Sequence, residues 1–305
     1  MPRSTARGRR VTSLPPLGEP TFDLQSHSLH SDGALRPSEV VAAAADAGVE
    51  LLALSDHDTV DGVQEALAAG GRLGLKVVTA VEISAVDPAG ADLHVLGYLL
   101  DDHNEMLVER LGDYRADRFR RGEAMAQKLR ELGFELDAEA LKRRVEQGKP
   151  LGRPHLAQAV VSHPANAQRL AGEGRVDPSA FLEAYLIEGR PAFTPRQHPS
   201  VAAAIETIHD AGGVAVWAHP FWDVAEPGEV LSSIDRFRAM GLDGVECFYA
   251  THTQEQTLML ADRCEELGLL STGSADFHGP QHRQFSRFRA FSTYGREPRL
   301  GPIAD

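Results

Sequence analysis

Histidines and acidic residues recur along the chain in short groups that could bind metal ions. These groups are His27, His30 and Asp32; Asp56, His57 and Asp58; Glu82; His94; His219; and Asp276 and His278. Alternate residues of an extended segment face the same side, so Asp276 and His278 could serve one ion. The chain has 13 histidines and 2 cysteines. A metal site would therefore consist of imidazoles and carboxylates, which favours Zn, Mn or Fe.

Such a cluster would support hydrolysis. Carboxylates can bridge two cations while neutral imidazoles complete each coordination shell, and a multi-metal centre lowers the pKa of a bridging water and polarises a phosphoryl oxygen. Taken singly, a loop histidine is usually solvated or hydrogen-bonded, and Asp-His-Asp could be a helix cap. The metal interpretation depends on the joint pattern, because so many acids and imidazoles together would be costly without a cation. The other histidines are interpreted as structural or surface residues: His103, His163, His198, His209 and His282.

Each candidate group lies in or directly after a predicted strand. Strands are predicted at 21–24, 51–54, 76–80, 93–99, 213–218, 244–248 and 269–273, and helices at 37–47, 60–69, 201–211, 234–240 and 253–267. This alternation predicts an α/β fold with a parallel sheet, either open or closed into a barrel. Since the carboxyl ends of parallel strands form the binding face, groups far apart in the chain would converge there.

Residues 101–195 interrupt the alternation with apolar residues at helical spacing, and Gly133 is a predicted helix stop. Further helices are predicted at 153–161 and 179–188. We therefore expect a barrel and a helical insertion, with a tail at each end. The ranges are 21–100 and 196–290 for the barrel, 101–195 for the insertion, 1–20 for a disordered tail and 291–305 for a C-terminal tail.

The composition of the chain limits which partners the protein can bind and in which cellular compartment we expect it. With 31 Lys and Arg against 44 Asp and Glu, the net charge of −13 argues against binding long nucleic acid by phosphate neutralisation. No apolar run approaches the roughly 18 residues of a membrane span. The basic N-terminus lacks the apolar core of a secretory signal. Few cysteines fit a reducing cytoplasm, and nothing indicates an obligate protein partner.

Short motifs running in order along the chain together resemble those of the PHP (polymerase and histidinol phosphatase) family of metal-dependent phosphoesterases. The matching segments are 23–28 (DLQSHS), 31–33 (SDG), 54–59 (LSDHDT), 81–84 (VEIS), 94–98 (HVLGY), 218–220 (AHP) and 274–279 (SADFHG). Each motif is weak alone, but the ordered set is specific. The resemblance implies a distorted seven-stranded (βα) barrel with an inserted helical subdomain.

The resemblance also implies a ligand set for two to three divalent ions, Mn, Zn or Fe. The implied ligands are His27, Asp32, His57, Glu82, His94, His219, Asp276 and His278. Glu82 would bridge two ions, and Asp32, His57 and His219 would favour a third. The implied catalytic residues are His57, His219 and Asp276, with His219 or Asp276 positioning or deprotonating the water.

One position departs from the family pattern. The first strand usually ends Asp-x-His-x-His, and Gln25 replaces the first of those histidines. An amide oxygen is a poorer ligand than imidazole for Zn or Mn. Gln25 could bind weakly, His30 could take its place, or Gln25 could only form hydrogen bonds. We expect two firm metal positions and leave the third open.

The insertion carries Gly-Arg-Pro-His at 152–155, which resembles that of stand-alone bacterial members. By this resemblance Arg153 and His155 would contact the substrate phosphate, and Arg196 and His252 are further candidates from nearby loops. Arg153, at a predicted helix start, could present a bidentate guanidinium. Most other basic residues of the insertion are interpreted as a solvated helix face.

The expected function is a metal-dependent phosphohydrolase in which metal-activated hydroxide attacks phosphorus. Its substrate would be a small nucleotide of the 3′,5′-bisphosphate type or a short oligonucleotide end. The alternatives are a histidinol-phosphatase-like enzyme, a cyclic-phosphodiester hydrolase, or a regulatory module whose metal site is weakened at Gln25. A polymerase-attached proofreading module is disfavoured by the length of 305 residues.

Overall fold

The computed structural model describes residues 20–88, 91–146, 151–195 and 199–305. Seven strands form one sheet whose spatial order follows the chain. The strands are β1 (Phe22–Asp23), β2 (Leu51–Leu54), β3 (Lys76–Val86), β4 (Asp92–Tyr98), β5 (Val214–Trp217), β6 (Gly244–Tyr249) and β7 (Leu270–Ser274). All seven coincide with predicted strands, and β3 runs six residues beyond its predicted end at 80. That extension places Glu82 within the strand rather than after it.

The sheet is mixed, whereas the sequence pattern predicts a parallel one. β4 runs antiparallel to both β3 and β5, and the other pairs are parallel. The physical reason is the connection: β3 ends at Val86 and β4 begins at Asp92, which is too short a link for the crossover that a parallel pair needs. The extended β3 and β4 therefore form a hairpin.

The sheet curls into a nearly closed barrel, because β1 and its following residues meet β7. Leu24 N donates to Gly273 O at 3.1 Å, and His27 N donates to Phe277 O at 2.8 Å. Across the interior, Tyr98 Oη donates to Leu24 O at 2.9 Å. Closure brings the first and last candidate groups of the chain to the same end of the barrel.

Helices cover the outside of the barrel. They are α1 (Pro37–Asp46), α2 (Val63–Leu73), α8 (Val201–Asp210), α9 (Pro220–Asp223), α10 (Pro227–Ala239) and α11 (Gln254–Leu267). The main core lies between them and the sheet, where Trp217 and Phe237 pack edge to face at 5.0 Å. The predicted helix at 234–240 begins earlier, at Pro227, whose fixed φ suits a first helical turn.

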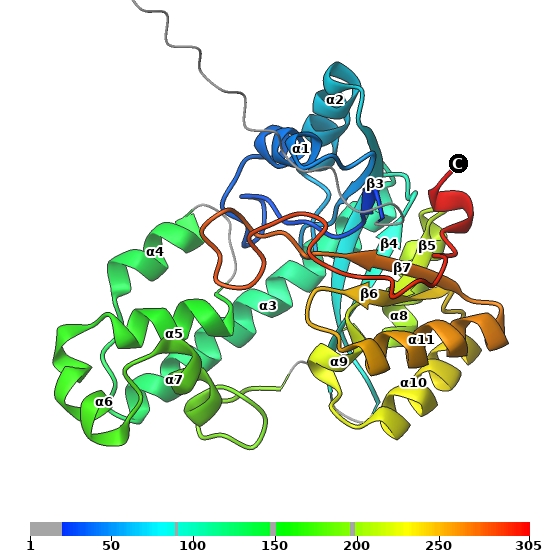
Figure 1. Ribbon diagram of the computed structural model, residues 1–305. Helices are drawn as coiled ribbons and strands as arrows, with labels where there is room; N and C mark the ends of the chain where they lie inside the picture. Colours follow the sequence, from blue (N-terminus) through cyan, green and yellow to red (C-terminus); the bar gives the residue numbers. More distant parts are fainter. Residues whose placement is uncertain (1–19, 89–90, 147–150, 196–198) are drawn as a thin grey trace, which may run out of the picture.

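The segment between β4 and α8 is largely helical in its described part and extends away from the barrel in Figure 1. It contains α3 (Glu105–Glu131), α4 (Ala138–Glu146), α5 (Arg153–Val161), the 3-10 turn η1 (Pro164–Asn166), α6 (Ala167–Glu173) and α7 (Pro178–Tyr185). The long α3 joins two cores: Leu107 packs in the barrel core, whereas Met125 packs in a second core with Phe134 and Phe181.

The residues after β7 pack against the barrel. Arg289 N donates to Asp23 Oδ2 at 2.7 Å, and Ser271 and Arg299 form a β-bridge. The chain then forms the 3-10 turn η2 (Gly301–Ile303), whose Ile303 is fully buried in the main core. The N-terminal tail predicted at 1–20 lies outside the described residues except for Pro20. None of the described helices is long and apolar enough to cross a membrane.

Candidate metal centre

The carboxylate of Glu82 lies at the centre of the cluster, with imidazoles on both sides. Its Oε2 lies 3.1 Å from His27 Nε2 and 3.3 Å from His57 Nδ1. Its Oε1 lies 2.9 Å from His94 Nδ1 and 3.2 Å from His219 Nε2. Each oxygen therefore faces its own pair of histidines, which is the arrangement that a carboxylate bridging two cations requires.

A second acid pair extends the cluster from the other side. Asp276 Oδ1 lies 3.0 Å from His27 Nε2 and 3.5 Å from His278 Nδ1. Asp32 lies with Oδ1 3.5 Å from His278 Nε2 and with Oδ2 3.6 Å from His57 Nε2. The structure thus brings together all eight ligands that the sequence predicts, from segments up to 251 positions apart (27 to 278).

These side chains fall into four overlapping groups, in each of which the ligand atoms lie within 4.8 Å of one another. The groups are His27, Asp32 and His57; His27, Asp276 and His278; His57, Glu82 and His94; and His94, His219 and Asp223. Shared members connect the groups into one continuous cluster of candidate ligands.

The backbone is unusual where strands end at the centre. Asp58, His219 and Asp276 have φ values of 53°, 29° and 54°, in the left-handed region that non-glycine residues rarely adopt. Such conformations persist where the surroundings over-determine them, and they are common at functional sites. At His219 and Asp276 this turn points a ligand into the barrel mouth.

The two acids that flank His57 hold the surrounding loops. Asp56 accepts hydrogen bonds from Ser28 N at 2.7 Å, Ser28 Oγ at 2.6 Å and Ser31 Oγ at 2.5 Å. Asp58 accepts from Ser84 N at 2.9 Å. Asp-His-Asp is therefore one candidate ligand between two loop-positioning carboxylates.

Facing charges control ionisation in the centre. Burial opposes the charge on Glu82, but the imidazoles, led by His57, outweigh it and hold the Glu82 pKa well below its usual value. Burial likewise opposes the charge on Asp276, yet neighbouring His278 and His27 lower its pKa to about 2. For His27, burial favours the neutral ring, but Asp276 and Glu82 raise its pKa well above the usual value. Both carboxylates are thus anionic at neutral pH.

Several buried polar atoms of the cluster have no hydrogen-bond partner among the described residues. They are His27 Nε2, Asp32 Oδ1, His57 Nδ1, Glu82 Oε2 and Asp276 Oδ1. Buried polar groups are normally satisfied, so such a concentration calls for an explanation. Divalent cations fit, because every one of these atoms is a metal-ligand type and all face the same space.

Gln25 occupies its position as a fully buried amide. Ser274 Oγ lies 3.3 Å from Gln25 Oε1 and donates to Glu246 Oε1 at 2.6 Å. Gln25 Nε2 has no hydrogen-bond partner in the described part of the chain. The alternative ligand His30 is exposed and belongs to none of the four ligand groups. The geometry thus supports hydrogen bonding by Gln25 over replacement by His30.

Sequence reasoning missed two residues that contact the ligands. Asp223 Oδ2 lies 3.6 Å from His219 Nδ1, the ring nitrogen opposite the one that faces Glu82. Tyr249 Oη donates to Asp276 Oδ2 at 2.8 Å, which leaves Oδ1 directed at His27. The four-residue spacing of His219 and Asp223 on one helical turn was available as a signal, whereas nothing local to Tyr249 indicates its contact.

A cavity of about 540 Å³ opens over the centre, between the barrel mouth and the insertion. The insertion supplies Arg118, Arg121, Arg153 and His155 to its lining. Arg153 is one-third exposed, and its Nη2 lies 3.8 Å from Asp92 Oδ2. Both predicted phosphate contacts of the insertion, Arg153 and His155, therefore face the same cavity as the metal ligands.

The sequence predicts two further contacts, Arg196 and His252. Arg196 falls outside the described residues. His252 is buried at 6% exposure, with Nδ1 3.1 Å from Cys247 O, and is not among the described residues that line the cavity. His282, which the sequence places among the structural or surface histidines, lines the cavity and lies 5.1 Å from His278 between ring centroids.

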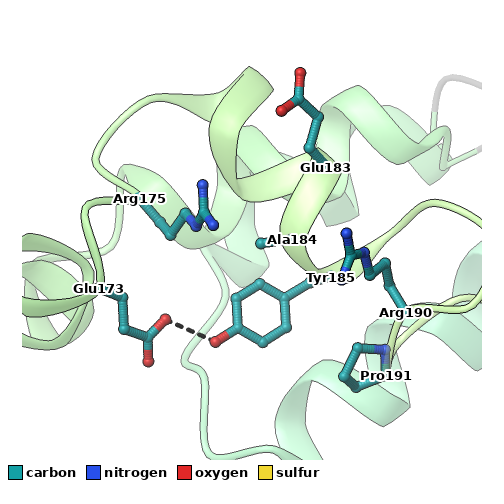
Figure 2. Close-up of a pocket in the computed structure, with 7 residues that line it drawn as sticks. All are labelled: Glu173, Arg175, Glu183, Ala184, Tyr185, Arg190 and Pro191. Carbon is teal, nitrogen blue, oxygen red and sulfur yellow. Dashed lines mark hydrogen bonds between the residues drawn. The ribbon is translucent and has the colours of Figure 1, made fainter.

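A second pocket, of about 520 Å³, lies entirely within the insertion. Figure 2 shows the Tyr185 ring between Arg175 and Arg190, with the Tyr185 hydroxyl directed at Glu173. That hydroxyl donates to Glu173 Oε2 at 2.6 Å. The lining holds two acids and two arginines, and none of the four ligand groups found among the described residues lies in it.

The sequence matches known proteins over most of its length. A model of the PHP domain matches residues 23–141. A 5′-3′ exoribonuclease of Haemophilus influenzae is 34% identical over 85% of this chain and 90% of its own. A 3′,5′-nucleoside bisphosphate phosphatase of Chromobacterium violaceum is 31% identical over 85% of this chain and 87% of its own.

Two solved structures have a similar fold over most of the chain. A Chromobacterium violaceum protein named an amidohydrolase, with bound sulfate and no metal, has a TM-score of 0.76 at 29% identity, covering 93% of each chain. A Bifidobacterium adolescentis protein described as a metal-dependent phosphoesterase has a TM-score of 0.71 at 28% identity, covering 86% of this chain and 89% of its own.

Fold, buried ligand cluster and these relatives together define a metal-dependent phosphoesterase, a hydrolase of ester bonds. The chain belongs to the PHP-domain family.

Proposed function

We propose that this chain removes a phosphate from a small nucleotide of the 3′,5′-bisphosphate type or from the end of a short oligonucleotide. The observation that carries the proposal is the position of Glu82, with a separate pair of imidazoles on each carboxylate oxygen. The relatives named a 3′,5′-nucleoside bisphosphate phosphatase and a 5′-3′ exoribonuclease support this substrate class.

The eight ligands would hold two to three divalent cations, Mn, Zn or Fe. Glu82 would bridge two of them, and Asp32 and His57 would complete a further position together with His278. When bound, such ions lower the pKa of water and polarise the phosphoryl oxygen. The chain itself holds the carboxylates ionised and the imidazoles oriented before any substrate arrives.

His57, His219 and Asp276 are the proposed catalytic residues. Tyr249 fixes the Asp276 carboxylate through Oδ2, and Oδ1 lies 3.0 Å from His27 Nε2, so the carboxylate is held in one orientation to position a water in the cavity. His219 is fixed from both sides, by Asp223 at Nδ1 and Glu82 at Nε2. A side chain that is already held in one orientation loses less freedom on reaching the transition state.

Arg153 and His155 are the proposed contacts to the substrate phosphate. Arg121 already binds Asp92 Oδ2 at 2.5 Å, whereas Arg153 lies at 3.8 Å from the same oxygen. The Arg153 guanidinium is therefore loosely paired and can turn its fork toward phosphate oxygens. Arg196 remains a further candidate from the sequence, and the buried position of His252 gives that residue no direct route to substrate.

The test is phosphate release from a substrate panel in the presence of added manganese. The panel contains a 3′,5′-nucleoside bisphosphate, a 5′-phosphorylated dinucleotide, histidinol phosphate and a cyclic ribose phosphate. The His57→Ala variant should lose activity, and the matched variant His209→Ala, which removes only a surface contact to Asp243, should keep it. Release no faster than in His57→Ala with either nucleotide substrate would refute the proposal. Hydrolysis of only the cyclic compound would identify a cyclic phosphodiesterase instead.

A further inference from the structure

A row of aromatic rings runs from the metal centre to the surface along one wall of the cavity. Phe285 lies 5.5 Å from His278 and 5.5 Å from Trp222, measured between ring centroids. His282 stacks on Phe285 at 5.2 Å with an interplanar angle of 13°. All four side chains line the same cavity as the cluster. The wall therefore connects a candidate metal ligand to solvent through packed rings.

Trp222 forms the outer end of this wall and is 50% exposed. It lies on α9, three positions after His219, and its backbone N donates to His219 O at 2.8 Å. This bond holds the Trp222 backbone close to a candidate metal ligand, and the indole packs on Phe285. The indole is half-exposed and lines the cavity, and ligand pockets are lined largely by aromatic and apolar side chains.

The cavity combines this aromatic wall with positive charge. Arg118, Arg153 and Arg283 also line it, and the Arg118 guanidinium lies 3.3 Å from Asp58 Oδ2 next to the centre. Cationic groups suit phosphate, and flat aromatic rings suit a nucleobase, which stacks on tryptophan without needing specific hydrogen bonds. A ligand with phosphate at one end and a planar ring at the other matches both parts.

We propose that Trp222, supported from behind by Phe285, is the nucleobase-stacking subsite of this enzyme. The proposal deepens the proposed function and rests on it. Because every base has a π-face, the subsite would accept purines and pyrimidines and would discriminate nucleotides from base-free phosphoesters. Trp222 thereby acts as a specificity-determining residue and takes no part in the chemical step.

The kinetic test compares two substrates in each variant: a 3′,5′-nucleoside bisphosphate and a ribose bisphosphate without a base. In Trp222→Leu, the ratio of kcat/KM between the two should fall about 10-fold, through a higher KM for the nucleotide. Trp222→Phe should keep most of the ratio. The matched control is Tyr294→Leu, another aromatic side chain 41% exposed but outside the cavity lining, which should leave the ratio unchanged.

A binding test needs no turnover. The chain has two tryptophans, and Trp217 is fully buried, so iodide quenching reports on Trp222. A non-hydrolysable nucleotide analogue should protect the indole from iodide, and ribose phosphate should not. If the analogue protects the indole but neither nucleotide of the substrate panel is hydrolysed, the stacking subsite is supported and the proposed function is refuted. An unchanged kinetic ratio in Trp222→Leu, or quenching unaffected by nucleotide, would overturn the subsite and leave phosphate release intact.

Discussion

The barrel mouth and the insertion each contain a pocket lined by charged residues, and they differ in how the charges are held. In the barrel, Glu82 is fully buried among four imidazoles. In the insertion, Glu173 is exposed and already paired with Arg169 at 2.8 Å and with Tyr185. Buried charge interacts strongly and needs a partner, whereas exposed pairs are screened by water. The comparison indicates that chemistry resides in the first pocket.

The largest expected effect comes from removing the central charge. Glu82→Gln keeps the shape of the side chain but removes the bridging anion, so activity should fall roughly 1,000-fold. Metal content measured by mass spectrometry should fall with it. The matched variant Glu183→Gln, in the insertion pocket, should change neither. Equal losses of activity and metal in the two variants would show that the two pockets do not differ in function.

The second effect tests whether residues 101–195 form a subdomain with its own core, as we propose. Phe181 is fully buried and packs edge to face on Phe134 at 5.1 Å. Phe181→Ala should cost about 3–5 kcal/mol of the insertion's unfolding free energy in urea, with metal stoichiometry retained. Phe237→Ala, in the barrel core, should lose metal as it loses stability. Loss of metal in Phe181→Ala would show that the two regions fold as one unit.

Orientation of His219 should matter less than the ligands themselves. Asp223→Asn removes the charge that faces His219 Nδ1 and should lower metal affinity or activity roughly 10–100-fold. The readout is a manganese titration of phosphate release. Asp235→Asn removes only a surface pair with Arg263 and serves as the control. A titration curve identical to that of the unmodified enzyme would exclude a positioning role for Asp223.

His252 should link the barrel's stability to pH. Burial lowers the pKa of His252 to about 4 from the usual 6.5 of histidine, so between these values the unfolded chain binds more protons than the folded one. The buried neutral ring contributes its full share to the free energy of unfolding above about pH 6.5, and this share is lost as the pH falls toward 4. Between pH 7 and pH 5 the loss is roughly 2 kcal/mol. His252→Asn should flatten this dependence in urea unfolding. A slope that is identical in His252→Asn and in the unmodified chain would exclude this link.

The smallest effect concerns the phosphate contact. Arg153→Lys keeps the charge but loses the guanidinium fork, so KM for the nucleotide should rise about 10-fold with little change in kcat. Arg190→Lys makes the same exchange in the insertion pocket and should leave KM unchanged. If both exchanges raise KM alike, the substrate spans the two pockets.

The strands and the candidate ligands could be predicted from the sequence. Alternating apolar segments predicted the strands, and the ordered motifs resembling the PHP family predicted the eight ligands, because strand formation and ligand chemistry are local properties. The prediction of a parallel fourth strand is wrong, because the predicted strands 76–80 and 93–99 leave a 12-residue link, whereas β3 continues to Val86 and leaves a link too short for a parallel crossover. Gln25 was recognised as a departure, but its contact with Ser274 joins segments 249 positions apart.

The chain by itself therefore determined which side chains were available and where strands would present them. Tertiary structure alone decided which oxygen of Glu82 faces which imidazole, that Tyr249 holds Asp276, that His252 turns inward, and that Trp222 stands at the rim beside Phe285. The physical reason is distance: local sequence sets backbone conformation and side-chain chemistry, whereas contacts of a few ångströms between remote residues exist only once the barrel has closed.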